Sequence, residues 1–65
     1  MKNTNRAIIN HGLFGGFSRY KLTSMISRFG NEVWFVSDAE TLDDYDIPAI
    51  IRIADSREEA VKGLL

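Results

Sequence analysis

Apolar positions are unevenly spaced along this 65-residue chain, and their spacing predicts its secondary structure. The run 7–9 is centred on β-branched residues, so 6–10 is expected to form a short buried strand. Glycines at 12, 15 and 16 predict a loop over 11–16. An apolar stripe with helical spacing then predicts a helix from Ser18 to Phe29, with Ser18 as the N-cap. The residues of the stripe are Leu22, Met25, Ile26 and Phe29.

The second half of the chain favours two strands and a closing helix. Residues 32–37 are rich in β-branched and aromatic types and predict a strand. Residues 47–54 predict another strand, with Pro48 near its start on a sheet edge and one face formed by Ile47, Ala49, Ile51 and Ile53. Ser56 and Glu59 have the spacing of a capping box, which predicts a final helix over 57–65.

These elements together predict a small α+β domain of order β-α-β-β-α, in which two helices pack on a three-stranded mixed sheet. The first two strands would be parallel through a right-handed crossover, and the last two would form an antiparallel hairpin. An alternative is a first β-hairpin that turns at Gly15 and Gly16. Residues 1–5 are expected to be a frayed polar N-terminus, and residues 6–65 a single domain.

Length and composition narrow the class of protein. A chain of this size buries only about 60% of its unfolded surface, and it has no cysteine for a disulfide or a thiolate metal site. Additional stability is therefore expected from self-association. Since no apolar run approaches the ~20 residues of a membrane span or forms a secretory leader, we expect a soluble cytoplasmic protein.

Charge divides the chain into two halves. Residues 1–31 contain five lysines and arginines and no acid, whereas residues 32–65 contain all nine acids and only three basic residues. The overall charge of −1 hides this polarity. Opposite charges on two halves favour association between molecules, so we expect a homo-oligomer, most simply a dimer.

The basic half also carries aromatic residues, which suggests an alternative function. Cations track a nucleic-acid backbone and aromatic rings stack on bases. The candidate residues are Arg19, Tyr20, Lys21 and Arg28. The sequence pI of about 5.7 is far below that of a typical nucleic-acid module, so this remains the second choice.

No motif predicts catalytic, cofactor or metal-ligating residues. The glycines at 12, 15 and 16 lack the spacing of a phosphate-binding loop, and His11 has no predicted nucleophile and carboxylate beside it. The acidic stretch lacks the glycine of a calcium loop. Its residues are instead candidates for an anionic surface that meets a basic partner: Asp38, Glu40, Asp43, Asp44 and Asp46.

The sequence therefore predicts a small non-catalytic module for protein–protein interaction, with a regulatory or adaptor role, and not an enzyme. Large apolar residues in the second half are candidates for its partner interface, since tryptophan is favoured at such sites. They are Trp34, Phe35, Leu64 and Leu65.

Overall fold

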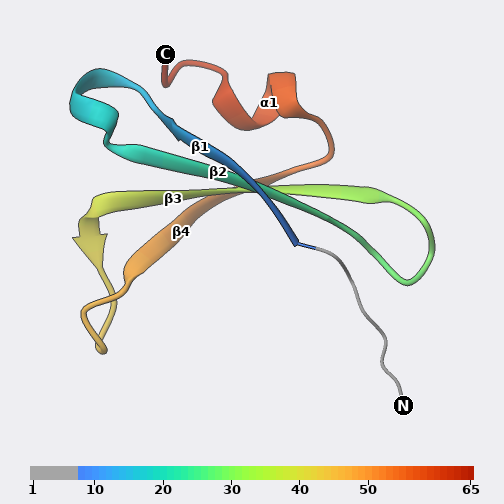
Figure 1. Cartoon of the computed structure of the whole chain (residues 1–65), viewed down its shortest axis with the longest axis horizontal. Coiled ribbons are helices and arrows are strands. Elements are labelled where there is room, and N and C mark those ends of the chain that lie inside the picture. The colour runs from blue at the N-terminus through green and yellow to red at the C-terminus, as the bar shows by residue number, and fades with distance from the viewer. Residues whose placement is uncertain (1–7) are drawn as a thin grey trace.

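The computed structural model describes residues 8–65, which form a four-stranded antiparallel sheet and one short α-helix (Figure 1). Each strand pairs with its neighbour in sequence, in the order β1-β2-β3-β4. The strands are β1 (Ile8–Phe14), β2 (Tyr20–Ile26), β3 (Glu32–Leu42) and β4 (Pro48–Ala54), and the helix is α1 (Arg57–Val61). The predicted frayed segment 1–5 and the first two residues of the first predicted strand lie outside the described residues.

The predicted three-stranded mixed sheet with two helices is wrong. Residues 18–29, predicted as a helix, contain the last residue of a 3-10 turn η1 (Gly16–Ser18), all of β2 and part of the next turn. An isolated helix of this length is marginal in water, whereas β2 pairs with β1 on one side and β3 on the other. The parallel crossover is therefore absent, and the hairpin alternative at Gly15 and Gly16 matches the structure.

The turn between β1 and β2 depends on the backbone conformation of Gly15. This residue has φ +84°, and a Cβ atom built there would lie 2.6 Å from Cδ2 of the Tyr20 ring. Ser18, predicted as a helix N-cap, instead lies in η1 with φ +55°, and its backbone N–H donates to the Gly15 carbonyl. A side chain at position 15 would have to displace an aromatic ring, so glycine permits this hairpin.

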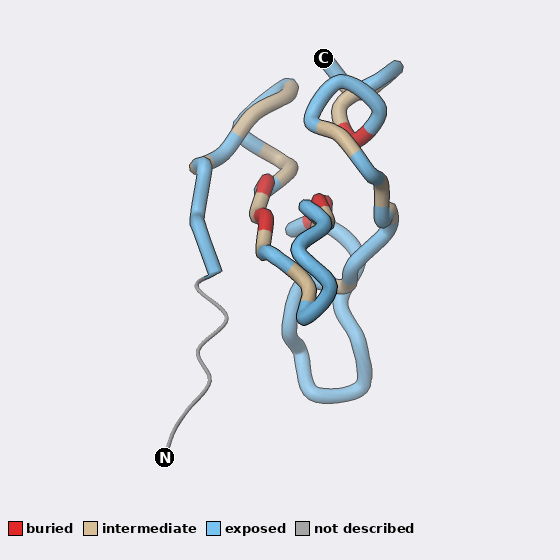
Figure 2. The backbone as a smooth tube through the Cα atoms, turned by 90° about the vertical axis from the view of Figure 1, so that its right-hand side faces the viewer, coloured by how far each residue is buried: buried red, intermediate tan, exposed pale blue. Residues whose placement is uncertain are grey.

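The core lies between α1 and one face of the sheet, which we call the helix-side face. Figure 2 shows buried positions only in the middle of the sheet and on α1. The apolar core residues are Leu22, Trp34, Val36 and Ala60. Helix α1 begins as predicted, because the Glu59 N–H donates to the Ser56 hydroxyl, but it ends at Val61 rather than Leu65. Arg52 on β4 donates to the carbonyl oxygens of Ala60, within α1, and of Lys62, just beyond its end.

Strands β3 and β4 form the antiparallel hairpin that the sequence predicted, with β3 running five residues further, to Leu42. Pro48 occupies the first position of the edge strand β4, as expected. A β-bulge interrupts the pairing, since Val36 pairs with Arg52 and the next residue, Ser37, pairs with Ile50. Ile51 is therefore the extra residue, and it shifts the alternation of β4.

Candidate interaction surface

The face of the sheet opposite the core carries apolar side chains from all four strands. Residues that pair across an antiparallel sheet point to the same side. The observed pairing of the strands therefore places side chains of β1, β2, β3 and β4 on one shared surface, which we call the open face. Its apolar residues are Ile8, Leu13, Met25, Val33, Phe35, Ile50 and Ile53.

No element within residues 8–65 covers the open face. Ile8 is 72% exposed and Ile53 is 65% exposed, while Leu13 and Ile50 are also exposed by more than half. Antiparallel sheets with one solvated face usually place polar residues on it. The open face also carries Asn10, Thr23, Lys21 and Ser37, but its exposed apolar residues on the edge strands β1 and β4 exceed what a solvated face needs. Exposed apolar surface of this kind marks a site of interaction with another macromolecule.

One end of the open face is hollowed. The hollow has a volume of about 210 Å³ and opens where β1, β2 and β3 approach the start of β4. Its lining residues are Leu13, Arg19, Lys21, Ser37, Ala39, Ile47 and Pro48. The mixture of aliphatic groups with the Lys21 stem suits an apolar side chain better than a polar ligand.

The structure does not bring the four predicted interface residues together. Trp34 is 7% exposed and belongs to the core beneath α1, and Leu64 packs against the same core. Phe35 follows Trp34 on β3 and lies on the open face. Leu65 is exposed at the C-terminal end of the chain. Of these four, Phe35 alone shares a surface with the exposed isoleucines.

The bulge at Ile51 explains why sequence reasoning missed part of the open face. Strict alternation groups Ile51 with Ile53, whereas the observed register groups Ile50 with Ile53. The number of isoleucines in 47–53 could have indicated that both faces of this strand carry apolar residues, because a strand with a single buried face needs fewer of them.

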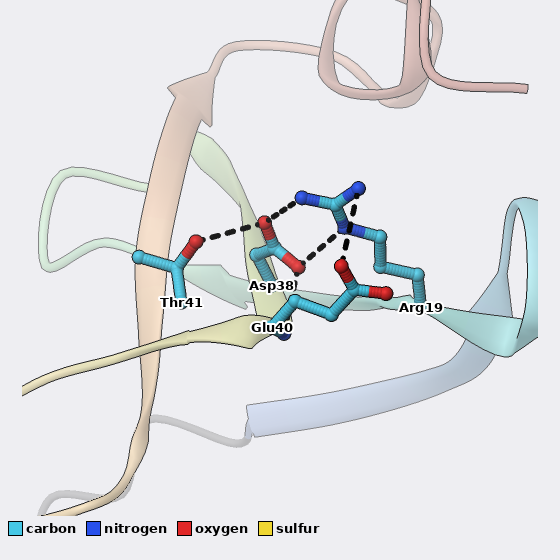
Figure 3. A network of polar contacts seen from close by, with 4 residues as sticks. All are labelled: Arg19, Asp38, Glu40 and Thr41. Carbon is cyan, nitrogen blue, oxygen red and sulfur yellow. Dashed lines mark hydrogen bonds and ion pairs between the residues drawn. The ribbon is translucent and has the colours of Figure 1, made fainter.

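A polar network ties the turn before β2 to β3 (Figure 3). Arg19 Nε and Nη2 each donate to a different Asp38 oxygen at 2.8 Å. Asp38 also accepts from the Glu40 N–H at 2.9 Å and from the Thr41 hydroxyl at 3.0 Å. The Arg19 hydrogen bonds hold the pKa of the Asp38 carboxyl well below its usual range. The same bonds raise the pKa of Arg19, so the pair stays charged at neutral pH.

This network removes one residue from each of the two charged surfaces that the sequence predicted, because it pairs Arg19 with Asp38. Among the nucleic-acid candidates, Arg19 is bound to Asp38 and lies 5.3 Å from the centre of the Tyr20 ring. Lys21 lies near the start of β2, while Arg28 lies in the turn beyond its other end. These four residues do not form one basic surface.

Three of the five residues of the predicted anionic surface lie at the tip of the β3–β4 hairpin. Asp38 is buried, and Glu40 lies 3.6 Å from an Arg19 nitrogen. Asp43, Asp44 and Asp46 remain at the turn, where the Asp43 carboxylate accepts from the backbone N–H groups of residues 45 and 47. We call these three residues the acidic tip.

His11 and Ser24 form a contact that the sequence did not predict. His11 Nε2 lies 2.7 Å from the Ser24 hydroxyl oxygen, and the imidazole stacks on Trp34 with ring centres 4.7 Å apart. Ser24 is 4% exposed, so its hydroxyl is poorly placed to attack a substrate. The contact satisfies a buried hydroxyl in the middle of β2.

The remaining observations concern metal ligands and membrane-spanning helices in residues 8–65. No three acidic or histidine side chains there are grouped so that they could hold a metal ion. In the same range, no helix has the length and apolar character needed to cross a membrane. Comparison with protein-family models, with curated proteins and with solved structures found no match.

Proposed function

We propose that this chain is a small non-catalytic interaction module, of regulatory or adaptor type, that packs the open face of its sheet against another protein. The observation that carries this proposal is the uncovered apolar surface contributed by all four strands. A single sheet with one helix buries only one of its faces, and stable domains cover apolar faces with a second layer. A partner would supply that layer.

The exposed area sets the expected strength of such an interaction. Fully burying one large aliphatic side chain stabilises by roughly 1.5–3 kcal/mol, so covering the exposed parts of four contributes roughly 4–8 kcal/mol. Association costs about 4–15 kcal/mol in lost freedom of motion. The open face therefore needs a partner that also brings apolar surface, because its own contribution does not exceed the cost of association.

The nucleic-acid alternative has less support. Arg19 is held by Asp38, and Lys21 and Arg28 lie toward opposite ends of β2. A nucleic-acid surface needs several cations along one groove, because each phosphate contact adds to the affinity.

Methyl NMR with a soluble paramagnetic probe tests the proposed function. Isoleucine methyl groups would be labelled, and the protein measured alone over a concentration series and after addition of lysate from the cells that produce it. Ile50 and Ile53 should lose access to the probe, while Ile9, which pairs with Ser24 on the helix-side face, should keep it. Unchanged access at Ile50 and Ile53 in both settings would refute the proposal.

A further inference from the structure

We infer that the open face is covered by a second copy of this chain, in a two-fold pair whose strands run in opposite directions across the interface. The inference rests on the proposed function and names its partner. It follows from features at the two ends of the open face that complement each other when one copy is turned end over end.

An exposed ring at one end matches the hollow at the other. Phe29 lies in the turn between β2 and β3 and is 83% exposed. The hollow opens beside Lys21 and Ser37, toward the other end of β2 and β3. In a two-fold pair with opposed strands, the turn that carries Phe29 in each copy lies at the end where the other copy has its hollow, so the exposed ring could enter it. The hollow's volume of about 210 Å³ suits one aromatic side chain.

Charge favours the same arrangement. The acidic tip lies beyond the end of β3, whereas Arg28 lies in the turn before its start. Residues 1–7 contribute Lys2 and Arg6 and no acid, and they join the sheet at Ile8, opposite Met25 near that same turn. Glu32 and Asp55 also lie toward this end, but Glu32 is on the helix-side face by alternation. Opposed strands therefore bring each acidic tip toward the end of the other copy that holds Arg28.

The opposite choice of direction is unfavourable. Two copies stacked with their strands in the same direction would place two acidic tips together, with six carboxylates against the Lys21 side chains that line the hollows at this end. Such a pair would also leave both exposed Phe29 rings beside each other and both hollows empty. Like charges that face each other across an interface weaken association.

The area of the sheet shows why contacts at its ends must contribute to the dimer interface. Four strands paired over about seven residues cover a plane of about 24 by 19 Å, whereas a stable interface buries about 800 Å² on each partner. The middle of the open face is smaller than this. Phe29 in the hollow and the charged ends would supply the remaining contact.

Light scattering and spin-label distances test this inference on the full chain. The purified protein should show a mass of twice 7.4 kDa at high micromolar concentration. The chain has no cysteine, so Tyr45→Cys and Asn31→Cys each provide one attachment point near the acidic tip and near the Phe29 turn. Pulsed electron paramagnetic resonance should give a distance above about 36 Å, the length of β3, between two copies labelled at position 45. A mixture of the two labelled proteins should add a clearly shorter distance, below about 30 Å.

A substitution at the ring gives a second readout. Phe29→Ala should weaken dimerisation at least about tenfold, because a buried aromatic side chain contributes 150–250 Å². Leu65→Ala, which removes an exposed apolar side chain outside the open face, should change it less than about twofold. Equal effects of the two substitutions would overturn the inference.

The outcomes also separate this inference from the proposed function. A short distance between two labels at position 45 would mean the wrong strand direction and would overturn the inference. A mass of 7.4 kDa at every concentration, together with methyl protection in lysate, would overturn it and leave the proposed function standing. A mass of 7.4 kDa with no protection anywhere would overturn both.

Discussion

Replacing Ile53 by lysine tests the open face near the C-terminal end of β4. Ile53 pairs with Phe35 and is 65% exposed in a single copy. Covering that exposed part contributes about 1–2 kcal/mol for each copy, or about 2–4 kcal/mol in a symmetric dimer. Lysine loses this contribution, although its stem still covers some apolar surface. The dissociation constant of the dimer should therefore rise roughly 30- to 700-fold.

Sedimentation equilibrium over a range of protein concentrations measures this change directly. The control is Ile9→Lys, which places the same charge at an exposed isoleucine on the helix-side face. Both variants should unfold in urea within about 1 kcal/mol of the parent, because neither side chain is buried in the single copy. Undiminished dimerisation of Ile53→Lys, or an equal loss in Ile9→Lys, would show that the open face is not the interface.

Three further predictions concern the single copy. Because the pKa of Asp38 is lower in the folded chain than in the unfolded one, its stabilising effect should be complete above about pH 5 and should fade as the pH falls toward 2. Urea midpoints should show this fading, and Asp38→Asn should show less of it. Gly15→Ala should destabilise clearly through the clash with Tyr20 and the positive φ, whereas Gly16→Ala, with open space around it, should not. Leu22→Ala should cost about 2–5 kcal/mol by urea unfolding, and a loss below 1 kcal/mol would contradict the described core.

Sequence reasoning succeeded where a feature depends on close neighbours in the chain. Ser56 and Glu59 are three residues apart, and the forward half of the predicted capping box forms, because the Ser56 hydroxyl accepts from the Glu59 N–H. Pro48 lacks a backbone donor, which restricts it to the start of an edge strand. Both predictions need only local geometry.

The largest error came from a segment that fits two periods. Leu22 and Met25 have helical spacing, but Leu22 and Ser24 have strand spacing and are the residues that are buried. A serine among apolar residues hides the strand period. Its burial is possible because His11, thirteen residues earlier, forms a hydrogen bond with the hydroxyl. No local pattern shows that contact.

The candidate surface was missed for a related reason. Asp38 was grouped with exposed acids, because its partner Arg19 lies nineteen residues away and is brought close only by the pairing of β2 with β3. The open-face position of Ile50 depends on the β-bulge, which is a property of two strands together. Features of this kind require the register to be known.

The sheet order repeats the chain order, and this has a consequence for the nascent protein. All four strands leave the ribosome before Ala60, the buried residue through which α1 completes the core. Until α1 is synthesised, Trp34 and Val36 are not covered by the helix, so an incomplete chain exposes apolar surface on both faces of the sheet. Chains released early, before residue 57, are therefore expected to aggregate more readily than chains that include α1.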